Sequence, residues 1–187
     1  FNVNGAVELY YNDNKKFETL TDGVNVTGTL KVNGSALTTG KILQVVQGTK
    51  TSEFSSTSTS YVDLGLSASI TPSTNSKILA IVTIHSYLNS DDHEGFGIKL
   101  IRTPSGGSAS TIFTSATKED VRGYTNFTGE HIRMYVRSSW DIFDSSVGGN
   151  GSTAITYKVQ VAGYNSSSVR YSSDGNYSSI TLWEVAA

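Results

Sequence analysis

The chain has 187 residues, and its 14 Lys and Arg residues against 16 Asp and Glu residues give a formal net charge of −2. This balance offers no electrostatic footprint for nucleic acid, and no basic run or apolar stretch of ~20 residues indicates membrane insertion. Cysteine is absent, which excludes a disulfide scaffold and suits assembly in a reducing cytosol. We therefore expect neither a nucleic-acid partner nor a membrane span.

The composition favours an all-β fold with polar turns. The chain has 18 Gly but only 2 Pro, and 16% of its residues are charged, which is typical of many short strands. Its 37% of hydrophobic residues can build one sizeable core. The chain begins with Phe1 and lacks a leader pattern, so we expect it to be a fragment of a longer protein.

Residues 1–40 contain only very short strand signals. The signals lie at 6–11, 16–20, 24–27 and 29–32, separated by Asn, Asp and Gly turns. Val24, Val26, Leu30 and Val32 form a thin apolar stripe that is interrupted by glycine. Such a segment buries too little surface to fold alone, so copies of the chain must cover the stripe. We expect the end of a β-rich fibrous stem in which copies of the chain form a parallel bundle; a disordered linker is the alternative.

From residue 41 onward the strand signals lengthen, and eight can be counted. They span 42–50, 60–71, 77–88, 95–103, 111–117, 130–144, 153–164 and 177–185. Eight antiparallel strands predict a jelly-roll-like β-sandwich head over residues 41–187.

The segment 77–88 organises this head, because apolar residues occupy both of its alternation phases. One phase comprises Ile78, Ala80, Val82, Ile84 and Leu88. That phase must face the core. The other phase starts apolar and then turns polar, so it needs partial cover from another subunit. The residues expected at a trimer interface are Leu79, Ile81, Tyr135, Trp183 and Val185.

Two stretches carry a resemblance to a known family. The segment G-A-V-E-L-Y-Y-N-D-N-K-K-F-E-T (5–19), followed by G-V-N-V-T-G-T-L-K-V-N-G (23–34), resembles stem repeats of tail fibres from phages of marine bacteria, including cyanophages. The remainder, which begins K-I-L-Q-V-V-Q (41–47) and ends S-S-I-T-L-W-E-V-A-A (178–187), is similar to the C-terminal head of such fibres. The resemblance implies a homotrimeric virion protein whose head touches the host surface.

Residues that could carry chemistry do not form a recognised motif. The three histidines are not at metal-ligand spacing, and the Gly-rich segments lack a phosphate-loop ending. Asp91, Asp92, His93 and Glu94 could hold a hard cation, but a solvated turn is the preferred interpretation. A glycosidase pair would have to come from Asp141, Asp144, Glu119 and Asp120. We expect no enzyme activity, no cofactor and no metal.

Counting strands sorts the connections of the head into two ends. Segments 72–76, 104–110 and 145–152 fall at the stem end, whereas 51–59, 89–94, 118–129 and 165–176 fall at the far end. The far set combines aromatic and charged residues, as sugar faces and protein hot spots require. The predicted receptor-binding residues are Asp91, Asp92, His93, Arg122, Tyr124, Phe127, Arg170 and Tyr171.

The sequence therefore favours a non-enzymatic phage tail-fibre tip that adsorbs the virion to a host-surface glycan or outer-membrane protein. Other virion tail proteins would join through the upstream stem, and assembly would take place in the cytoplasm of the host bacterium. Two alternatives stay open: a purely structural head that trimerises and caps a fibre, and a trimeric signalling head of the C1q or tumour-necrosis-factor type.

Overall fold

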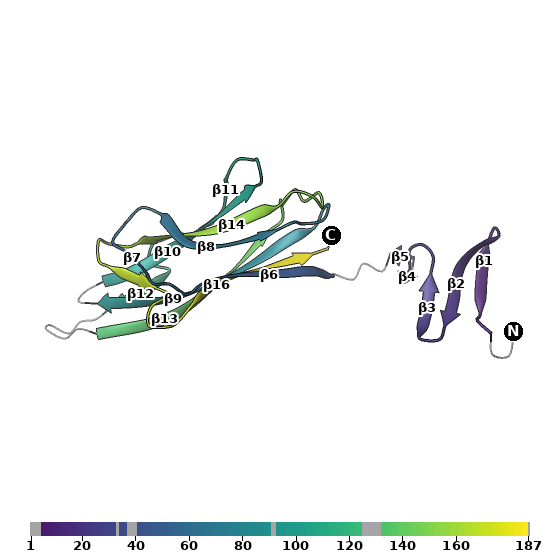
Figure 1. Ribbon diagram of the computed structural model, residues 1–187, viewed down its shortest axis with the longest axis horizontal. Coiled ribbons are helices and arrows are strands. Elements are labelled where there is room, and N and C mark those ends of the chain that lie inside the picture. The colour runs from purple at the N-terminus through teal and green to yellow at the C-terminus, as the bar shows by residue number, and fades with distance from the viewer. Residues whose placement is uncertain (1–4, 33, 37–40, 91–92, 125–131, 187) are drawn as a thin grey trace. The chain divides into compact units, whose positions relative to one another are not determined.

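The computed structural model describes residues 5–32, 34–36, 41–90, 93–124 and 132–186. All regular elements among these residues are β-strands, which confirms the predicted all-β class. The chain divides into two compact units, Phe1–Gly40 (unit 1) and Lys41–Ala187 (unit 2). Figure 1 labels their strands.

Unit 1 is built from short antiparallel strands. Its strands are β1 (Glu8–Tyr11), β2 (Asn14–Leu20), β3 (Gly23–Val26), β4 (Lys31–Val32) and β5 (Ser35–Ala36). Strands β1, β2 and β3 form one sheet in chain order, and β4 pairs with β5. Asn12 and Asp13, which connect β1 to β2, both have positive φ (49° and 59°), as a tight two-residue hairpin turn requires.

Unit 1 contains no core of its own. None of its side chains whose burial is described is buried, and Leu9, Val24 and Leu30 are each more than half exposed. Lys15 lies 2.5 Å from Glu8 and 2.8 Å from Glu18, but exposed ion pairs of this kind add little stability. The apolar surface of unit 1 is therefore left uncovered by a single chain.

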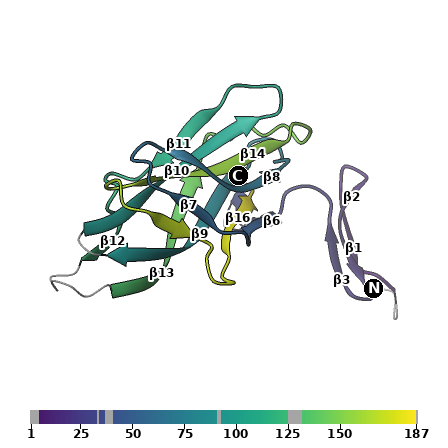
Figure 2. The same ribbon diagram turned by 60° about the vertical axis from the view of Figure 1, so that its left-hand side comes forward.

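Unit 2 is a sandwich of two antiparallel sheets (Figures 1 and 2). Its strands are β6 (Ile42–Lys50), β7 (Phe54–Ser56), β8 (Val62–Ile70), β9 (Lys77–Ser90), β10 (His93–Pro104), β11 (Ser110–Thr114), β12 (Val121–Tyr124), β13 (Ile132–Asp144), β14 (Ile155–Gly163), β15 (Val169–Tyr171) and β16 (Ser178–Val185). The six-stranded sheet has the order β6-β16-β9-β15-β7, with β13 also paired to β9. The five-stranded sheet has the order β11-β10-β14-β8, with β12 also paired to β10.

The eight long strands wrap in a regular order. In chain order they are β6, β8, β9, β10, β11, β13, β14 and β16. Strands β6, β16, β9 and β13 lie side by side in one sheet, and β8, β14, β10 and β11 lie side by side in the other. The predicted β-sandwich is confirmed.

The core lies between the two sheets. The apolar residues of β9 that were predicted to face the core are each 0% exposed: Ile78, Ala80, Val82, Ile84 and Leu88. On β14 the inward side chains Ile155, Tyr157, Val159 and Val161 are also buried. Period-two alternation therefore assigned the faces of both strands correctly.

Three short strands were missed in the sequence. Strands β7, β12 and β15 lie inside the predicted connections 51–59, 118–129 and 165–176. Strand β15 pairs with both β7 and β9, and β12 pairs with β10, so these strands extend the two sheets. Strand β11 also ends at Thr114, before the predicted Thr117.

Candidate functional site

One end of the sandwich gathers the residues where the chain enters and leaves unit 2. The amide of Ala186 donates to the carbonyl of Lys41 at 2.8 Å, and that of Gly151 donates to Pro72 at 2.8 Å. The amide of Ser105 likewise donates to Ala154 at 2.8 Å. We call this the Lys41 end; it holds the connections 72–76, 104–110 and 145–152, as the strand count predicted.

Strands β7 and β12, which lie in the connections 51–59 and 118–129, are at the opposite end of the sandwich (Figures 1 and 2). The amide of Gly163 donates to Ser58 at 2.8 Å, and that of Tyr164 donates to Gly95 at 2.9 Å. The ammonium of Lys118 donates to the carbonyl of Thr59. These hydrogen bonds tie the connection 51–59 to the end of β14 and to Lys118, and the end of β14 to β10.

Five of the predicted receptor-binding residues have no described side chain. Asp91, Asp92 and Phe127 lie outside the described residues. His93 and Tyr124 are described in their backbone, where they stand opposite each other across β10 and β12. These five residues remain candidates from the sequence alone.

Two of the predicted receptor-binding residues present cations at the surface. Arg122 is exposed and lies 3.5 Å from Glu119. Arg170 donates through Nε and Nη2 to the two carboxylate oxygens of Glu53 at 3.0 and 2.6 Å. Its guanidinium also lies 5.0 Å from the ring centre of Tyr87. Arg170 is therefore held in one orientation by a carboxylate and a ring.

Tyr171 was wrongly assigned to the receptor-binding set. Its side chain is 0% exposed, and its ring packs edge-on against Phe96 with the centres 5.1 Å apart. Burial raises the pKa of its hydroxyl well above the ordinary value. Strand β15 places Tyr171 on the inner face of the six-stranded sheet, so this residue is part of the core.

The outer face of the six-stranded sheet carries an apolar band near the Lys41 end. Val45, Trp183, Leu79 and Phe143 stand in register across β6, β16, β9 and β13. Val45 is 53% exposed and Phe143 is 55% exposed. With the half-buried Ile81 and Val185 they form what we call the apolar band. Four of the five predicted trimer-interface residues belong to it; the fifth, Tyr135, lies farther along β13.

The outer face of the five-stranded sheet is polar by contrast. Ser69 and Thr156 share a hydrogen bond of 2.8 Å there, and Lys158 lies 2.8 Å from Asp63. Gln160 continues the same phase of β14. Only the six-stranded sheet presents the apolar band, so the two faces of the sandwich suit different surroundings.

Beyond the apolar band, the same outer face becomes polar and then aromatic. Thr49, Ser179, Thr83 and Ser139 stand in register as a polar row. Past this row is a group that we call the tyrosine patch: His85, Tyr87, Tyr135, Arg137, Asp174 and Tyr177. Tyr135 is 53% exposed and Tyr177 is 48% exposed.

Contacts within the tyrosine patch hold its side chains in place. The ring of Tyr135 lies edge-on to Tyr87 at 5.1 Å and 6.2 Å from His85, and its hydroxyl donates to Asp174 at 3.1 Å. The guanidinium of Arg137 lies 5.9 Å from the centre of the Tyr177 ring.

The surroundings of His85 favour the neutral form of its imidazole. Burial and the nearby Arg137 cation lower the pKa of its imidazole, with the Asp174 carboxylate acting in the opposite sense. Sequence reasoning did not single out the tyrosine patch, although the alternation of Tyr135 and Arg137 on β13 was a signal for it.

Two of the carboxylates considered for glycosidase chemistry are engaged in contacts within the fold. Asp144 is buried and accepts hydrogen bonds from Arg102 at 2.9 Å and from the hydroxyl of Tyr157 at 2.7 Å. Asp120 accepts from the indole of Trp140 at 3.4 Å. Within the described ranges, no three His, Asp or Glu side chains group as metal ligands would. The described part of the chain also contains no helix that could cross a membrane.

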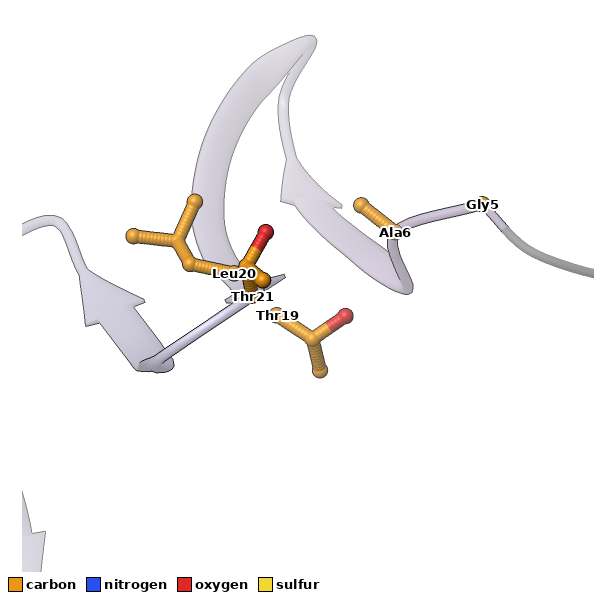
Figure 3. Close-up of a pocket in the computed structure, with 5 residues that line it drawn as sticks. All are labelled: Gly5, Ala6, Thr19, Leu20 and Thr21. Atoms are coloured by element: carbon orange, nitrogen blue, oxygen red, sulfur yellow. The ribbon is translucent and has the colours of Figure 1, made fainter.

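Two surface hollows lack the groups that acid–base chemistry needs. A hollow of about 350 Å³ in unit 1 is drawn in Figure 3. It is lined by Gly5, Ala6, Thr19, Leu20 and Thr21. A second, of about 430 Å³, lies at the Lys41 end, and Lys158 is its one titratable lining residue. Neither arrangement pairs an acid with a base.

Comparisons with known proteins leave the family open, because no protein family model and no curated protein matches the chain. Among solved structures, it is similar to a chain of infectious bursal disease virus, Gt strain, with 12% identity and a TM-score of 0.34, over 89% of this chain and 41% of that one. It is also similar to a chain of T=1 particles derived from infectious bursal virus, with 15% identity and a TM-score of 0.29, over 89% and 47%. The chain thus spans less than half the length of either.

Proposed function

We propose that this chain is the tip of a homotrimeric phage tail fibre, which attaches the virion to a host-surface glycan or outer-membrane protein without catalysing a reaction. The observation that supports the proposal is that a single chain leaves two apolar surfaces uncovered. One is unit 1, which has no buried side chain among those described. The other is the apolar band of unit 2.

The two uncovered surfaces are consecutive in the chain, which favours further copies of the chain as the cover for both. Unit 2 begins at Lys41, and Val45 of the apolar band follows within a few residues. When copies associate through unit 1, their apolar bands are held at a high effective concentration and associate in turn. A closed ring of three copies is the symmetry implied by the tail-fibre resemblance.

The opposite end of the sandwich supports the attachment role. Arg122 and Arg170 present cations there, and the connection 51–59 is hydrogen-bonded to the end of β14. Rigid scaffolds commonly present binding residues in this way. In this proposal the Lys41 end faces the fibre and the virion, and the opposite end meets the host.

The test combines the mass of the assembly with its binding to cells. Multi-angle light scattering at micromolar concentration should give three times the chain mass of 20.0 kDa, and the fluorescently labelled trimer should bind intact host cells. A mass of one chain would contradict the assembly. A trimer that binds no cell type infected by the parent phage would favour the purely structural head.

A further inference from the structure

From the geometry of the six-stranded sheet we infer that the tyrosine patch is a binding site for a neutral glycan. The inference rests on the proposed attachment function and deepens it, because it names the receptor class and moves the contact from the loops to a sheet face. The patch lies near the far-end connections, since its neighbour Arg170 is paired with Glu53 of the segment 51–59.

The two exposed rings supply the apolar contact that a sugar needs. Tyr135 and Tyr177 are each about half exposed, although large aromatic side chains usually bury most of their surface. The CH groups on one face of a pyranose ring can stack on such rings. Tyr135 projects from β13, a long strand paired along its length with β9, so its ring is held on a rigid element.

Hydrogen-bonding groups surround the rings and are already oriented. Asp174 accepts from Tyr135 at 3.1 Å and has a second carboxylate oxygen, which can accept from a sugar hydroxyl. The Arg137 guanidinium lies against the Tyr177 ring and has several N–H donors for sugar oxygens. Because these contacts exist in the unbound chain, little ordering remains to be done when a ligand binds.

The charge and composition of the patch favour a neutral sugar over other ligands. Within the patch one cation, Arg137, is matched by one anion, Asp174, and beside it Arg170 is paired with Glu53. Among the described side chains of the patch the charges therefore balance, which gives a charged ligand no net attraction there. The patch also contains no aliphatic side chain, whereas the buried core of a protein interface is mostly apolar.

The tyrosine patch is separate from the apolar band, which is the surface of unit 2 that copies of the chain are proposed to cover. Tyr135 and Phe143 lie eight residues apart on β13, which corresponds to about 26 Å of strand. The polar row that contains Thr83 and Ser139 lies between them, with the two hydroxyls 3.3 Å apart. The apolar band can thus be covered while Tyr135 stays accessible.

The direct test is an array of neutral oligosaccharides built from hexoses and N-acetylhexosamines, with sialylated and uronic-acid oligosaccharides beside them, probed with the full chain. The wild type should bind members of the neutral set. Tyr135→Ala and Tyr177→Ala should each weaken binding at least about tenfold, because each removes a stacking ring. Tyr135→Phe keeps the ring and should weaken it less than about fivefold.

Tyr164→Ala is the matched control, since Tyr164 is 46% exposed and follows β14 of the other sheet; its binding should equal that of the wild type. If Tyr135→Ala loses its melting transition, Tyr177→Ala and Arg137→Ala decide the result. Failure of the wild type to bind any neutral sugar, a preference for acidic ones, or unchanged binding by the ring variants would overturn the inference.

Binding to host cells separates this inference from the proposed function. Equal adsorption by the wild type and Tyr135→Ala would leave the attachment function standing and remove the patch from it. Adsorption that is lost after protease treatment of the cells, but survives periodate oxidation of their sugars, would assign the contact to a protein and overturn the inference. A single-chain mass combined with neutral-sugar binding would keep the patch and reject the trimeric fibre.

Discussion

Glu184 is a carboxylate enclosed in the sandwich near the Lys41 end. Its side chain is 0% exposed. It accepts hydrogen bonds from the side chain of Gln44 at 2.5 Å and from the amide of Ser73 at 2.7 Å. Burial raises the pKa of Glu184, but the hydrogen bonds from Gln44, Ser76 and Ser73 together outweigh it and hold the pKa below its ordinary value. The charged form is thus the one that fits the fold.

Replacing Glu184 with Gln should lower the free energy of unfolding at pH 7 by about 1.5 to 3 kcal/mol. The amide keeps one acceptor, but its NH₂ group would face a donor, either Gln44 or the Ser73 amide. Urea denaturation followed by tryptophan fluorescence measures the difference. Asp141→Asn changes an exposed carboxylate on β13 and should leave the midpoint nearly unchanged; an equal loss in both variants would contradict the role of Glu184.

The same residue sets a dependence of stability on pH. Because the pKa of Glu184 is lower in the folded state than in the unfolded chain, its contribution is fully present above the unfolded pKa, about 4.3. It is lost as the pH falls through the folded value. The gap in unfolding free energy between wild type and Glu184→Gln should therefore be largest at pH 6 to 7 and narrow below pH 4. A gap that is constant from pH 7 to pH 3 would show that the charge is not involved.

At the scale of elements, β6 and β8 approach each other closely where the two sheets meet. A Cβ built on Gly48 of β6 would lie 2.0 Å from the carbonyl oxygen of Ser67 on β8. Because the clashing atom belongs to the backbone of Ser67, the clash can be removed only by moving one of the two strands. Glycine at this position therefore sets how tightly the sheets close.

The substitution Gly48→Ala should lower the free energy of unfolding by about 1 to 3 kcal/mol, as overpacking does in other cores. Differential scanning calorimetry should show the corresponding fall in melting temperature. Gly23→Ala is the matched control, because a Cβ there meets nothing within 4 Å. A Gly48→Ala variant as stable as Gly23→Ala would mean that the strands have room to separate.

Strand β9 is the central element, because β16 and β13 pair with its two edges. Val82→Asp should prevent cooperative folding, since a charge without a partner would be buried at a cost of several kcal/mol, a large part of the ~5 to 15 kcal/mol that holds a domain together. Circular dichroism during heating checks this. His85→Ala, on the outer phase, should still melt cooperatively. A cooperative transition in Val82→Asp would show that Val82 does not face the core.

The long strands could be predicted because each one carries its own periodicity. Strand β9 alternates over enough residues to fix its inner face without any partner. Strands β7, β12 and β15 have only three or four residues, so they show no period, and pairing across distant segments decides their structure. Tyr171 was misplaced for this reason, because nothing local shows that β15 turns its ring inward.

The candidate site shows the same limit. The apolar band could be predicted in part, since Leu79, Trp183 and Val185 are apolar residues on the outward phase of their strands, where polar residues are otherwise found. The tyrosine patch could not, because it combines β9, β13 and the turn at 172–177. Asp174 in that turn has a φ of 55°, and its contact with Tyr135 spans 39 positions. Only the strand register brings these groups together.

At the scale of the whole molecule, the apolar band should decide the assembly. Leu79→Glu or Trp183→Glu should make the trimer dissociate into single folded chains at higher concentrations than the wild type, because copies cannot bury the new charge and only unit 1 is left to join them. Light scattering and the melting transition together check the result. Gln160→Glu places the same charge on the polar outer face of the other sheet and should leave the mass unchanged. Trimers that resist dilution as well as the wild type in both band variants would show that the apolar band does not join the copies.

The polar row across the six-stranded sheet also bears on how such a protein can evolve. Substitutions more than about 10 Å apart with no shared partners have nearly additive effects, and Thr83 and Ser139 keep Tyr135 well away from Phe143. In the proposed fibre tip, a lineage can therefore change Tyr135, Arg137 or Tyr177, and with them the sugar bound, without selecting again for assembly. The proposal thus implies that host range drifts by mutation at one end of β13 while the other end stays fixed.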